Sequence, residues 1–229
     1  MYKKFITACM ALVALAAFAL PASAMAENKP QLVEGSTAVA AGSSIVGTNI
    51  GETLFVATDG TTVQVRCTTA KLSGTLATNS AGTVKGEITT FDFSGTGAVA
   101  AHNGLNECTT AGIFGAGSAW ITVTTNPLIL ESNPTFTTDE FRVSAKGGGN
   151  VKFIIGSTQI GECEYEGTSS LKGDFTTEAT TKLTVRNTQA GSGSKLIRGN
   201  FLCPSSGQLS MKFLLETTNG TELGATKLP

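Results

Sequence analysis

The fold is constrained most by short segments in which apolar and polar residues alternate, separated by Gly, Asn, Ser and Asp. The clearest alternation is found in residues 62–67, 181–186 and 208–216. A period of two is typical of strands that bury one face of a sheet and expose the other. Further strands are expected at residues 53–58, 70–78, 85–93, 118–125, 140–145 and 151–155. The sequence therefore predicts an all-β protein, built as an antiparallel β-sandwich or a flattened barrel.

The dipeptides Asp59-Gly60 and Asn219-Gly220 are typical of tight hairpin turns, whose central residues adopt positive φ. The two halves of the sequence also share a pattern. Each half contains a strand with a cysteine, a Leu-x-Gly segment at residues 72–74 or 171–173, a glycine-rich loop and a second cysteine. A duplicated β unit would explain this pattern, and a chance likeness between threonine-rich strands is the alternative.

Residues 1–26 have the three parts of a secretory signal peptide. Lys3 and Lys4 supply the positive start, residues 5–20 are almost entirely apolar, and residues 22–26 place small side chains at the cleavage positions. A membrane anchor is the alternative, but the apolar run is shorter than the ~20 residues that span a bilayer. The sequence thus predicts export, removal of the signal peptide, and a secreted, extracellular protein.

The mature chain is expected to comprise an N-terminal arm and first strand at residues 27–52 and a single β-sandwich domain at residues 53–229. No later apolar segment is long enough to cross a bilayer, so no membrane span is expected in the mature chain. The formal net charge is −1 and only 14% of the residues are charged. Because no basic excess is available to neutralise phosphates, nucleic acid is excluded as a partner, and an unknown protein or glycan surface is expected instead.

Removal of the signal peptide takes Cys9 away and leaves an even number of cysteines, which in an exported chain indicates disulfides. We expect Cys67 to pair with Cys108 and Cys163 with Cys203, because each pair then closes a loop of similar length within its own half. The other two pairings stay open. Zinc sites need closely spaced cysteines, which this sequence lacks, so no metal site and no cofactor are predicted.

Three segments resemble known proteins: residues 65–70 (VRCTTA), 161–166 (GECEYE) and 183–188 (LTVRNT). In these segments the chain is similar to uncharacterised secreted β-rich proteins of actinobacteria, and the resemblance extends over most of the chain after about Thr53. It implies export, a bacterial origin and a β fold. It implies no activity, ligand or catalytic residue.

One short segment carries the clearest candidate for chemistry. Glu162, Glu164 and Glu166 would lie on one face of a strand, about 7 Å apart, with Cys163 and Tyr165 on the other face. Glycosidases use two carboxylates that are about 5–10 Å apart, so the three glutamates are candidate catalytic residues of a carbohydrate-active enzyme. The alternative is a solvated face whose charges meet Lys or Arg on neighbouring strands.

Two aromatic residues are candidates for binding a glycan. Trp120 shares its face with threonines and could stack on a sugar ring, and Tyr165 lies between the glutamates in sequence. Burial of the Trp in a second hydrophobic layer is the alternative. The single histidine, His102, falls in an expected loop, and no serine has the G-x-S-x-G context of a hydrolase. The sequence therefore contains no complete catalytic set.

The favoured function is that of a secreted, disulfide-stabilised, non-enzymatic β-sandwich with a structural or interaction role at the cell exterior. Few charges and many threonine hydroxyls favour hydrogen-bonded contacts with proteins or glycans. The alternative is a carbohydrate-active enzyme or a carbohydrate-binding module that uses the face of Glu162, Glu164 and Glu166.

Overall fold

The structure is a computed structural model that describes residues 30–57, 63–80, 83–94, 108–111, 117–132, 140–157, 159–167, 171–178, 182–187 and 193–227. None of these residues belongs to a helix, and most of them belong to strands. The expected turn at Asn219-Gly220 is present, with Gly220 at a φ of 78°. The expected signal peptide, the turn at Asp59-Gly60 and His102 lie outside the described residues.

The strands cover the segments in which alternation was found, and every pairing between them is antiparallel. In chain order they are β1 (Pro30–Glu34), β2 (Thr37–Ala38), β3 (Ser44–Asn49), β4 (Thr53–Ala57), β5 (Val63–Cys67), β6 (Thr69–Ser80), β7 (Thr83–Ser94), β8 (Cys108–Thr110), β9 (Gly117–Val123), β10 (Leu128–Ser132), β11 (Glu140–Ala145), β12 (Lys152–Ser157), β13 (Gly161–Gly167), β14 (Leu171–Glu178), β15 (Lys182–Asn187), β16 (Gly193–Arg198), β17 (Ser206–Thr217) and β18 (Gly224–Lys227).

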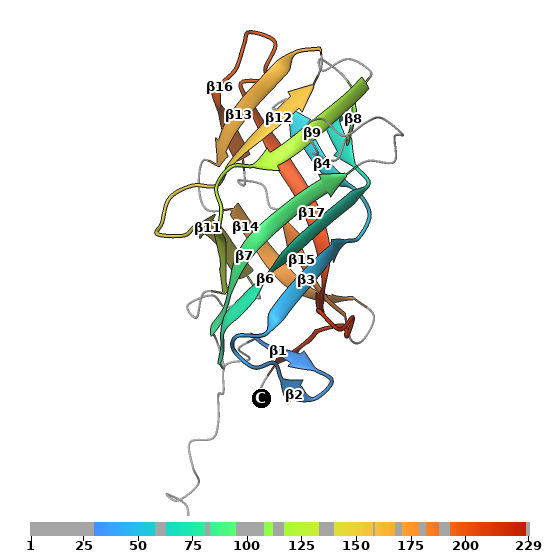
Figure 1. The fold of residues 1–229 in the computed structure, drawn as a ribbon, viewed down its shortest axis with the longest axis vertical. Helices are drawn as coiled ribbons and strands as arrows, with labels where there is room; N and C mark the ends of the chain where they lie inside the picture. Colours follow the sequence, from blue (N-terminus) through green and yellow to red (C-terminus); the bar gives the residue numbers. More distant parts are fainter. Residues whose placement is uncertain are drawn as a thin grey trace, which may run out of the picture.

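Two closed rings of strands form the body of the molecule, and both contain β17 (Figure 1). The lower barrel consists of β15, β14, β11, β10, β7, β6, β3 and β17, and it closes because β17 also pairs with β15. The upper barrel consists of β17, β16, β13, β12, β9, β8, β5 and β4, and it closes because β4 pairs with β17. The all-β, antiparallel prediction is therefore confirmed, in the form of closed barrels.

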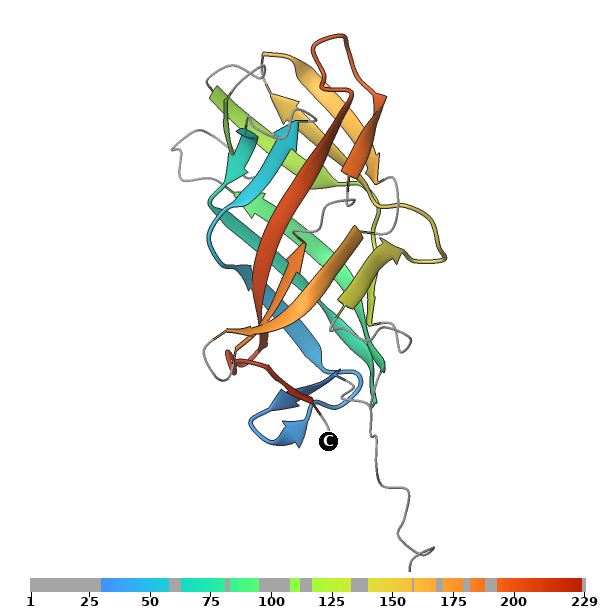
Figure 2. The same ribbon diagram turned by 180° about the vertical axis from the view of Figure 1, so that it is seen from behind.

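β17 is long enough to serve both barrels. Its residues 211–217 pair with β15 and β3 in the lower barrel, whereas residues 206–210 pair with β16 and β4 in the upper barrel. The two barrels consequently lie end to end along the long axis of the molecule, as the views in Figures 1 and 2 show.

The order of strand pairing is repeated in the two halves of the chain. Each pairing among β3 to β10 in the first half has a counterpart among β11 to β17 in the second half, where the long β17 takes the places of both β9 and β10. Each half supplies four strands to each barrel, with β17 counted in both. The register agrees as well, because Gly74 lies opposite Ile45 and Gly173 opposite Phe141. Both Leu-x-Gly segments thus occupy equivalent positions, as expected for a duplicated β unit.

A small sheet of β18, β1 and β2 covers the free end of the lower barrel (Figure 1). Leu32 on β1 and Leu223, which directly precedes β18, are buried in the interior at 2% and 0% exposure. Asn79 fixes this sheet: its side chain accepts a hydrogen bond from the Leu32 N–H (2.9 Å) and donates to the carbonyl oxygens of Leu32 and Val39 (both 2.8 Å). Much of the segment expected to be an N-terminal arm is therefore a cap, and its last strand, β3, belongs to the barrel.

The upper barrel is filled by aromatic rings. Phe55, Phe153 and Tyr165 are buried, and the ring centroid of Phe55 lies 5.0 Å from that of Tyr165 and 6.2 Å from that of Phe153. These three residues come from β4, β12 and β13, so the cluster joins both halves of the chain. Its packing fixes the inward direction of alternate residues on each of these strands.

Both disulfides lie in the upper barrel. Cys67 is bonded to Cys108 and joins β5 to β8, while Cys163 is bonded to Cys203 and joins β13 to the segment that precedes β17. The expected pairing is confirmed. Because β5 and β8 correspond to β13 and β16 in the repeated order, the two bridges brace equivalent places in the two halves.

Candidate functional site

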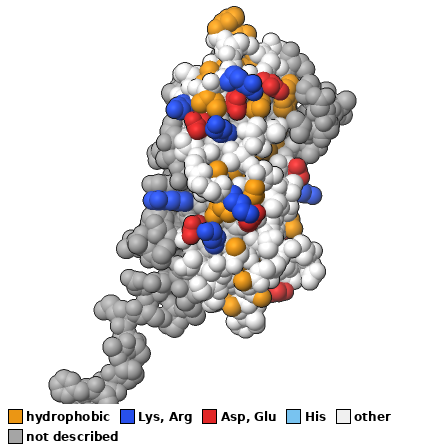
Figure 3. All heavy atoms as spheres, turned by 60° about the vertical axis from the view of Figure 1, so that its left-hand side comes forward, with side chains coloured by type: hydrophobic (Ala, Val, Ile, Leu, Met, Phe, Trp, Pro, Cys, Tyr) orange, Lys and Arg blue, Asp and Glu red, His pale blue; other side chains and the backbone are white. Residues whose placement is uncertain are grey.

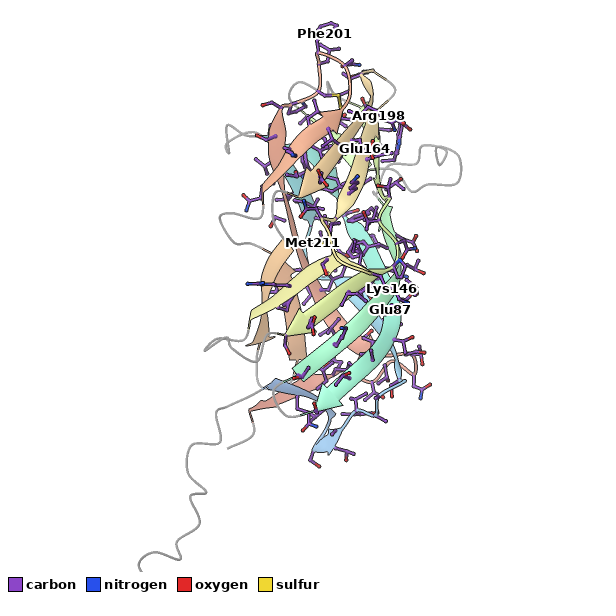
Figure 4. All side chains as sticks on the ribbon, turned by 90° about the vertical axis from the view of Figure 1, so that its left-hand side faces the viewer. Glu87, Lys146, Glu164, Arg198, Phe201 and Met211 are labelled. Atoms are coloured by element: carbon purple, nitrogen blue, oxygen red, sulfur yellow. A yellow bond between two sulfur atoms is a disulfide. The ribbon has the colours of Figure 1, made fainter. Side chains whose placement is uncertain are left out.

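The end of β16 and the segment between β16 and β17 project apolar side chains into solvent at one pole of the molecule. Phe201 is 94% exposed, and Ile197 and Leu202 are about two-fifths exposed. Within the described ranges, only Ile50 is a further large hydrophobic residue with comparable exposure. Figure 3 shows hydrophobic side chains projecting at this pole, and Figure 4 labels Phe201 there. Such a concentration of exposed apolar surface is typical of an interaction site.

Residues 199–203, which we call the Phe201 loop, are held in a fixed conformation. Asn200 accepts a hydrogen bond from the Leu202 N–H at its side-chain oxygen (2.9 Å) and one from the Cys203 N–H at its carbonyl oxygen (3.1 Å). The Asn200 amide also donates to the carbonyl oxygen of Ile160 in the neighbouring turn. Together with the disulfide at Cys203, these bonds reduce the conformational entropy that the loop would lose on binding.

The candidate glutamates lie beside this loop, on the outer face of β13. Glu164 forms an ion pair with Arg198 on β16, with 3.0 Å between carboxylate and guanidinium atoms (Figure 4). The Glu162 side chain is exposed, and its backbone carbonyl lies 3.8 Å from the sulfur of Cys203. The two glutamates therefore differ in their surroundings: one is neutralised by a cation, and the other presents its charge to solvent next to the loop.

Glu166 is flanked by cations on both sides of β13. In the register of the sheet, Glu166 lies opposite Lys152 on β12 and opposite Lys195 on β16. Opposite charges at directly paired positions stabilise a sheet by about 0.2–1 kcal/mol each. The arrangement has the form of a solvated face with cross-strand charge pairs, and a catalytic role for these glutamates stays a prediction.

Trp120 is 5% exposed and lies outside the aromatic interior of the upper barrel. Its indole covers Gly156 on the neighbouring strand so closely that a side chain at Gly156 would overlap the ring. Tyr165 is buried inside the barrel. Neither ring presents a face to solvent in this structure, and a role of either in binding stays a prediction.

The Tyr165 hydroxyl is buried and donates a hydrogen bond to the carbonyl oxygen of Pro204 (3.1 Å). Burial raises the pKa of this hydroxyl well above its ordinary value of 10.0, because the phenolate would lose its hydration. The unfolded chain thus releases this proton at a lower pH than the folded chain does. The stability linked to Tyr165 is fully present below pH about 10 and is lost as the pH rises above that value.

We therefore expect the free energy of unfolding to fall more steeply above pH about 10 in the wild type than in Tyr165→Phe. Denaturant titrations at a series of alkaline pH values measure this difference. Tyr2 and Tyr165 are the only tyrosines, so in protein that lacks residues 1–26 the ultraviolet absorbance of tyrosinate reports Tyr165 alone. Ionisation of this residue in the folded protein near pH 10 would contradict the expectation.

Within the ranges that the structure describes, no three His, Cys, Asp or Glu side chains are grouped so that they could hold a metal ion. The same ranges contain no apolar helix of membrane-spanning length. Comparisons of the chain with protein-family models, with curated proteins and with solved structures found no match. The Phe201 loop and the adjoining face of β13 therefore define the candidate site by their geometry alone.

Sequence reasoning missed Phe201. One signal could have indicated it: Phe201 and Leu202 directly follow Gly199-Asn200 and precede Cys203. A Gly-Asn dipeptide indicates a turn, and because a turn rarely buries two large apolar residues, exposure of these two could have been predicted. A disulfide next to such a pair gives a further reason to expect a rigid, projecting loop.

Proposed function

We propose that the protein is exported and acts at the cell exterior as a non-enzymatic interaction module, which binds a partner protein through the Phe201 loop. The observation that carries the proposal is the 94% exposure of Phe201 on a loop fixed by a disulfide and by Asn200. Export is supported by the signal-peptide pattern and by the two disulfides, which persist in oxidising compartments.

The form of the loop favours a concave apolar pocket on the partner. A single aromatic side chain that projects from a rigid support is a typical anchor residue, and such anchors provide most of the binding energy in many interfaces. Leu202, on the same loop, and Ile197, on β16, are further exposed apolar residues. The exposed carboxylate of Glu162 lies next to the loop, while Arg198 is already paired, so a basic rim on the partner would be complementary.

An anionic lipid surface fits this loop less well. Binding of a peripheral protein to such a surface draws on unpaired Lys or Arg near the apolar residues. Beside the Phe201 loop, the Arg198 guanidinium is engaged by Glu164, and the exposed Glu162 adds a negative charge. The carbohydrate-active alternative also has less support, because the central carboxylate, Glu164, is neutralised by this same arginine.

A photo-crosslinking amino acid placed at position 201 of the full chain, in the cell that produces it, tests the proposal. We expect one discrete protein adduct from position 201 and none from position 50, where Ile50, an exposed hydrophobic residue, directly follows β3 of the lower barrel. An excess of purified wild-type protein should suppress the adduct, and an excess of Phe201→Ser should not.

The isolated partner then allows a quantitative test. Phe201→Ala should weaken its binding at least about tenfold, as expected for an anchor residue, whereas Ile50→Ala should leave the dissociation constant unchanged. Equal adducts from positions 201 and 50, or adducts with lipid in place of protein, would overturn the proposal.

A further inference from the structure

The Cys163–Cys203 disulfide is the more accessible of the two bridges. Cys203 is 8% exposed, whereas the three other bridged cysteines are at most 2% exposed. Cys203 also lies between two strands, while Cys67 and Cys108 both belong to strands of the upper barrel. Reduction begins when a thiolate attacks one of the two sulfur atoms, so its rate depends on access to that sulfur. We therefore expect a thiol in solution to reduce the bridge at Cys203 first.

This bridge is a covalent support of the Phe201 loop. The loop turns around the Cys203 side chain, and Gly199 packs so closely against it that a Cβ atom at residue 199 would overlap the sulfur. The same sulfur is bonded to Cys163 on β13. Reduction removes this covalent link to β13 and leaves the loop to weaker contacts such as the hydrogen bonds of Asn200.

The strands on either side of the loop have their own backbone pairings. β16 pairs with β13, and β17 pairs with both β16 and β4. None of these hydrogen-bonded ladders contains the sulfur–sulfur bond, so the ring of strands remains when the bridge is reduced. The effect of reduction is therefore concentrated in the loop.

The Phe201 ring is in water because the loop holds it there. Burial of apolar surface is favourable, so a loop that is free to move folds this ring against protein. Leu202 and Ile197 provide exposed apolar surface close to Phe201 in the chain. A ring that is folded in this way no longer projects toward a partner, and a mobile loop loses more conformational entropy on binding.

We propose that the Cys163–Cys203 disulfide is a redox switch, through which a dithiol reductant turns off the Phe201 loop. The inference rests on the proposed function, because it concerns binding by the same loop. One thiolate of the dithiol attacks the Cys203 sulfur, and the Cys163 sulfur leaves as a thiolate and takes up a proton. The second thiol then displaces the Cys203 sulfur. The bridge gains two electrons and two protons, and the dithiol is oxidised to a disulfide.

A time course of reduction tests the selectivity. Folded protein that lacks residues 1–26 is exposed to dithiothreitol, quenched with acid, denatured and alkylated, and mass spectrometry of a digest locates the alkylated cysteines. We expect the Cys163–Cys203 bridge to be reduced at least about tenfold faster than the Cys67–Cys108 bridge. Equal rates for the two bridges would overturn the proposal.

Backbone ¹⁵N relaxation measures the response of the loop without any partner. The order parameters of Phe201 and Leu202 should fall on reduction from about 0.85 to below about 0.6, while that of Ile50 stays constant. The double variant Cys163→Ala/Cys203→Ala should show the low values with and without dithiothreitol. Its matched control, Cys67→Ala/Cys108→Ala, should respond as the wild type does. Unchanged order parameters in the reduced wild type would contradict the switch.

Binding to the isolated partner is the third measurement. The reduced protein is freed of dithiothreitol under argon, so that disulfides of the partner stay intact. It should bind at least about tenfold more weakly than the oxidised protein, and reoxidation should restore the affinity. If both forms bind equally, the switch is disproved and the proposed function stands. If the oxidised protein binds no partner, the proposed function fails, and the first two measurements still decide whether reduction releases the loop.

Discussion

Replacement of both Cys67 and Cys108 by alanine is expected to lower the free energy of unfolding by about 4 kcal/mol. The two cysteines are separated by 41 residues, and the chain-entropy model gives this magnitude for a loop of that length. Alanine leaves the space of both sulfur atoms empty, and because both positions are at most 2% exposed, this lost packing adds to the effect. Equilibrium denaturation by guanidinium chloride without reductant measures the difference.

The second disulfide provides an internal comparison. Cys163 and Cys203 are separated by 40 residues, so their replacement should cost a similar amount of stability. Only this second variant should also weaken partner binding, because Cys203 anchors the Phe201 loop. A loss below about 1 kcal/mol for either pair would contradict the expectation, because the cross-link would then hardly constrain the unfolded chain.

Phe55→Ala is expected to cost about 4 kcal/mol of unfolding free energy. The Phe55 side chain is 0% exposed and touches the rings of both Phe153 and Tyr165, so its removal leaves a cavity at the centre of the upper barrel. Rigid strands on every side limit the collapse of that cavity, because each is held in a closed ring of pairings. Denaturant titration followed by far-ultraviolet circular dichroism measures the loss.

Phe201→Ala is the matched control for this core substitution. The same atoms are removed from a side chain that is 94% exposed, so stability should change by no more than about 0.5 kcal/mol. A similar loss for both variants would mean that Phe201 is packed in solution, which would contradict its assignment as a projecting residue.

The sequence predicted the strands well because alternation is a local property. Residues 208–216 place apolar residues at every second position, with Leu214 as the one apolar residue between them, and β17 extends this segment by two residues at its start and one at its end. The Leu-x-Gly segments at 72–74 and 171–173 correctly indicated a repeated unit, since they occupy the same register in the two halves. The four cysteines predicted their pairing because loops of similar length fit a repeated unit.

The closure of the barrels could not be predicted from the sequence. β17 pairs with β3, β4, β15 and β16, and two of these strands are far away in the chain. No local pattern specifies which distant strand supplies the last set of hydrogen bonds. The candidate site was missed for a related reason. The sequence of a short segment does not show whether its phenylalanine is buried or projects into solvent. Here the hydrogen bond of Asn200 and the disulfide of Cys203 determine that the loop projects.

The placement of the chain ends has a practical consequence. Pro30 and Lys227 are paired residues of β1 and β18, so both ends of the described chain emerge together at the cap. Phe201 lies at the opposite pole (Figure 4). A protein attached to a sensor surface, or fused to a fluorescent reporter, through either end would point the Phe201 loop away from the attachment. Immobilisation by a terminal tag therefore suits the binding measurements described above.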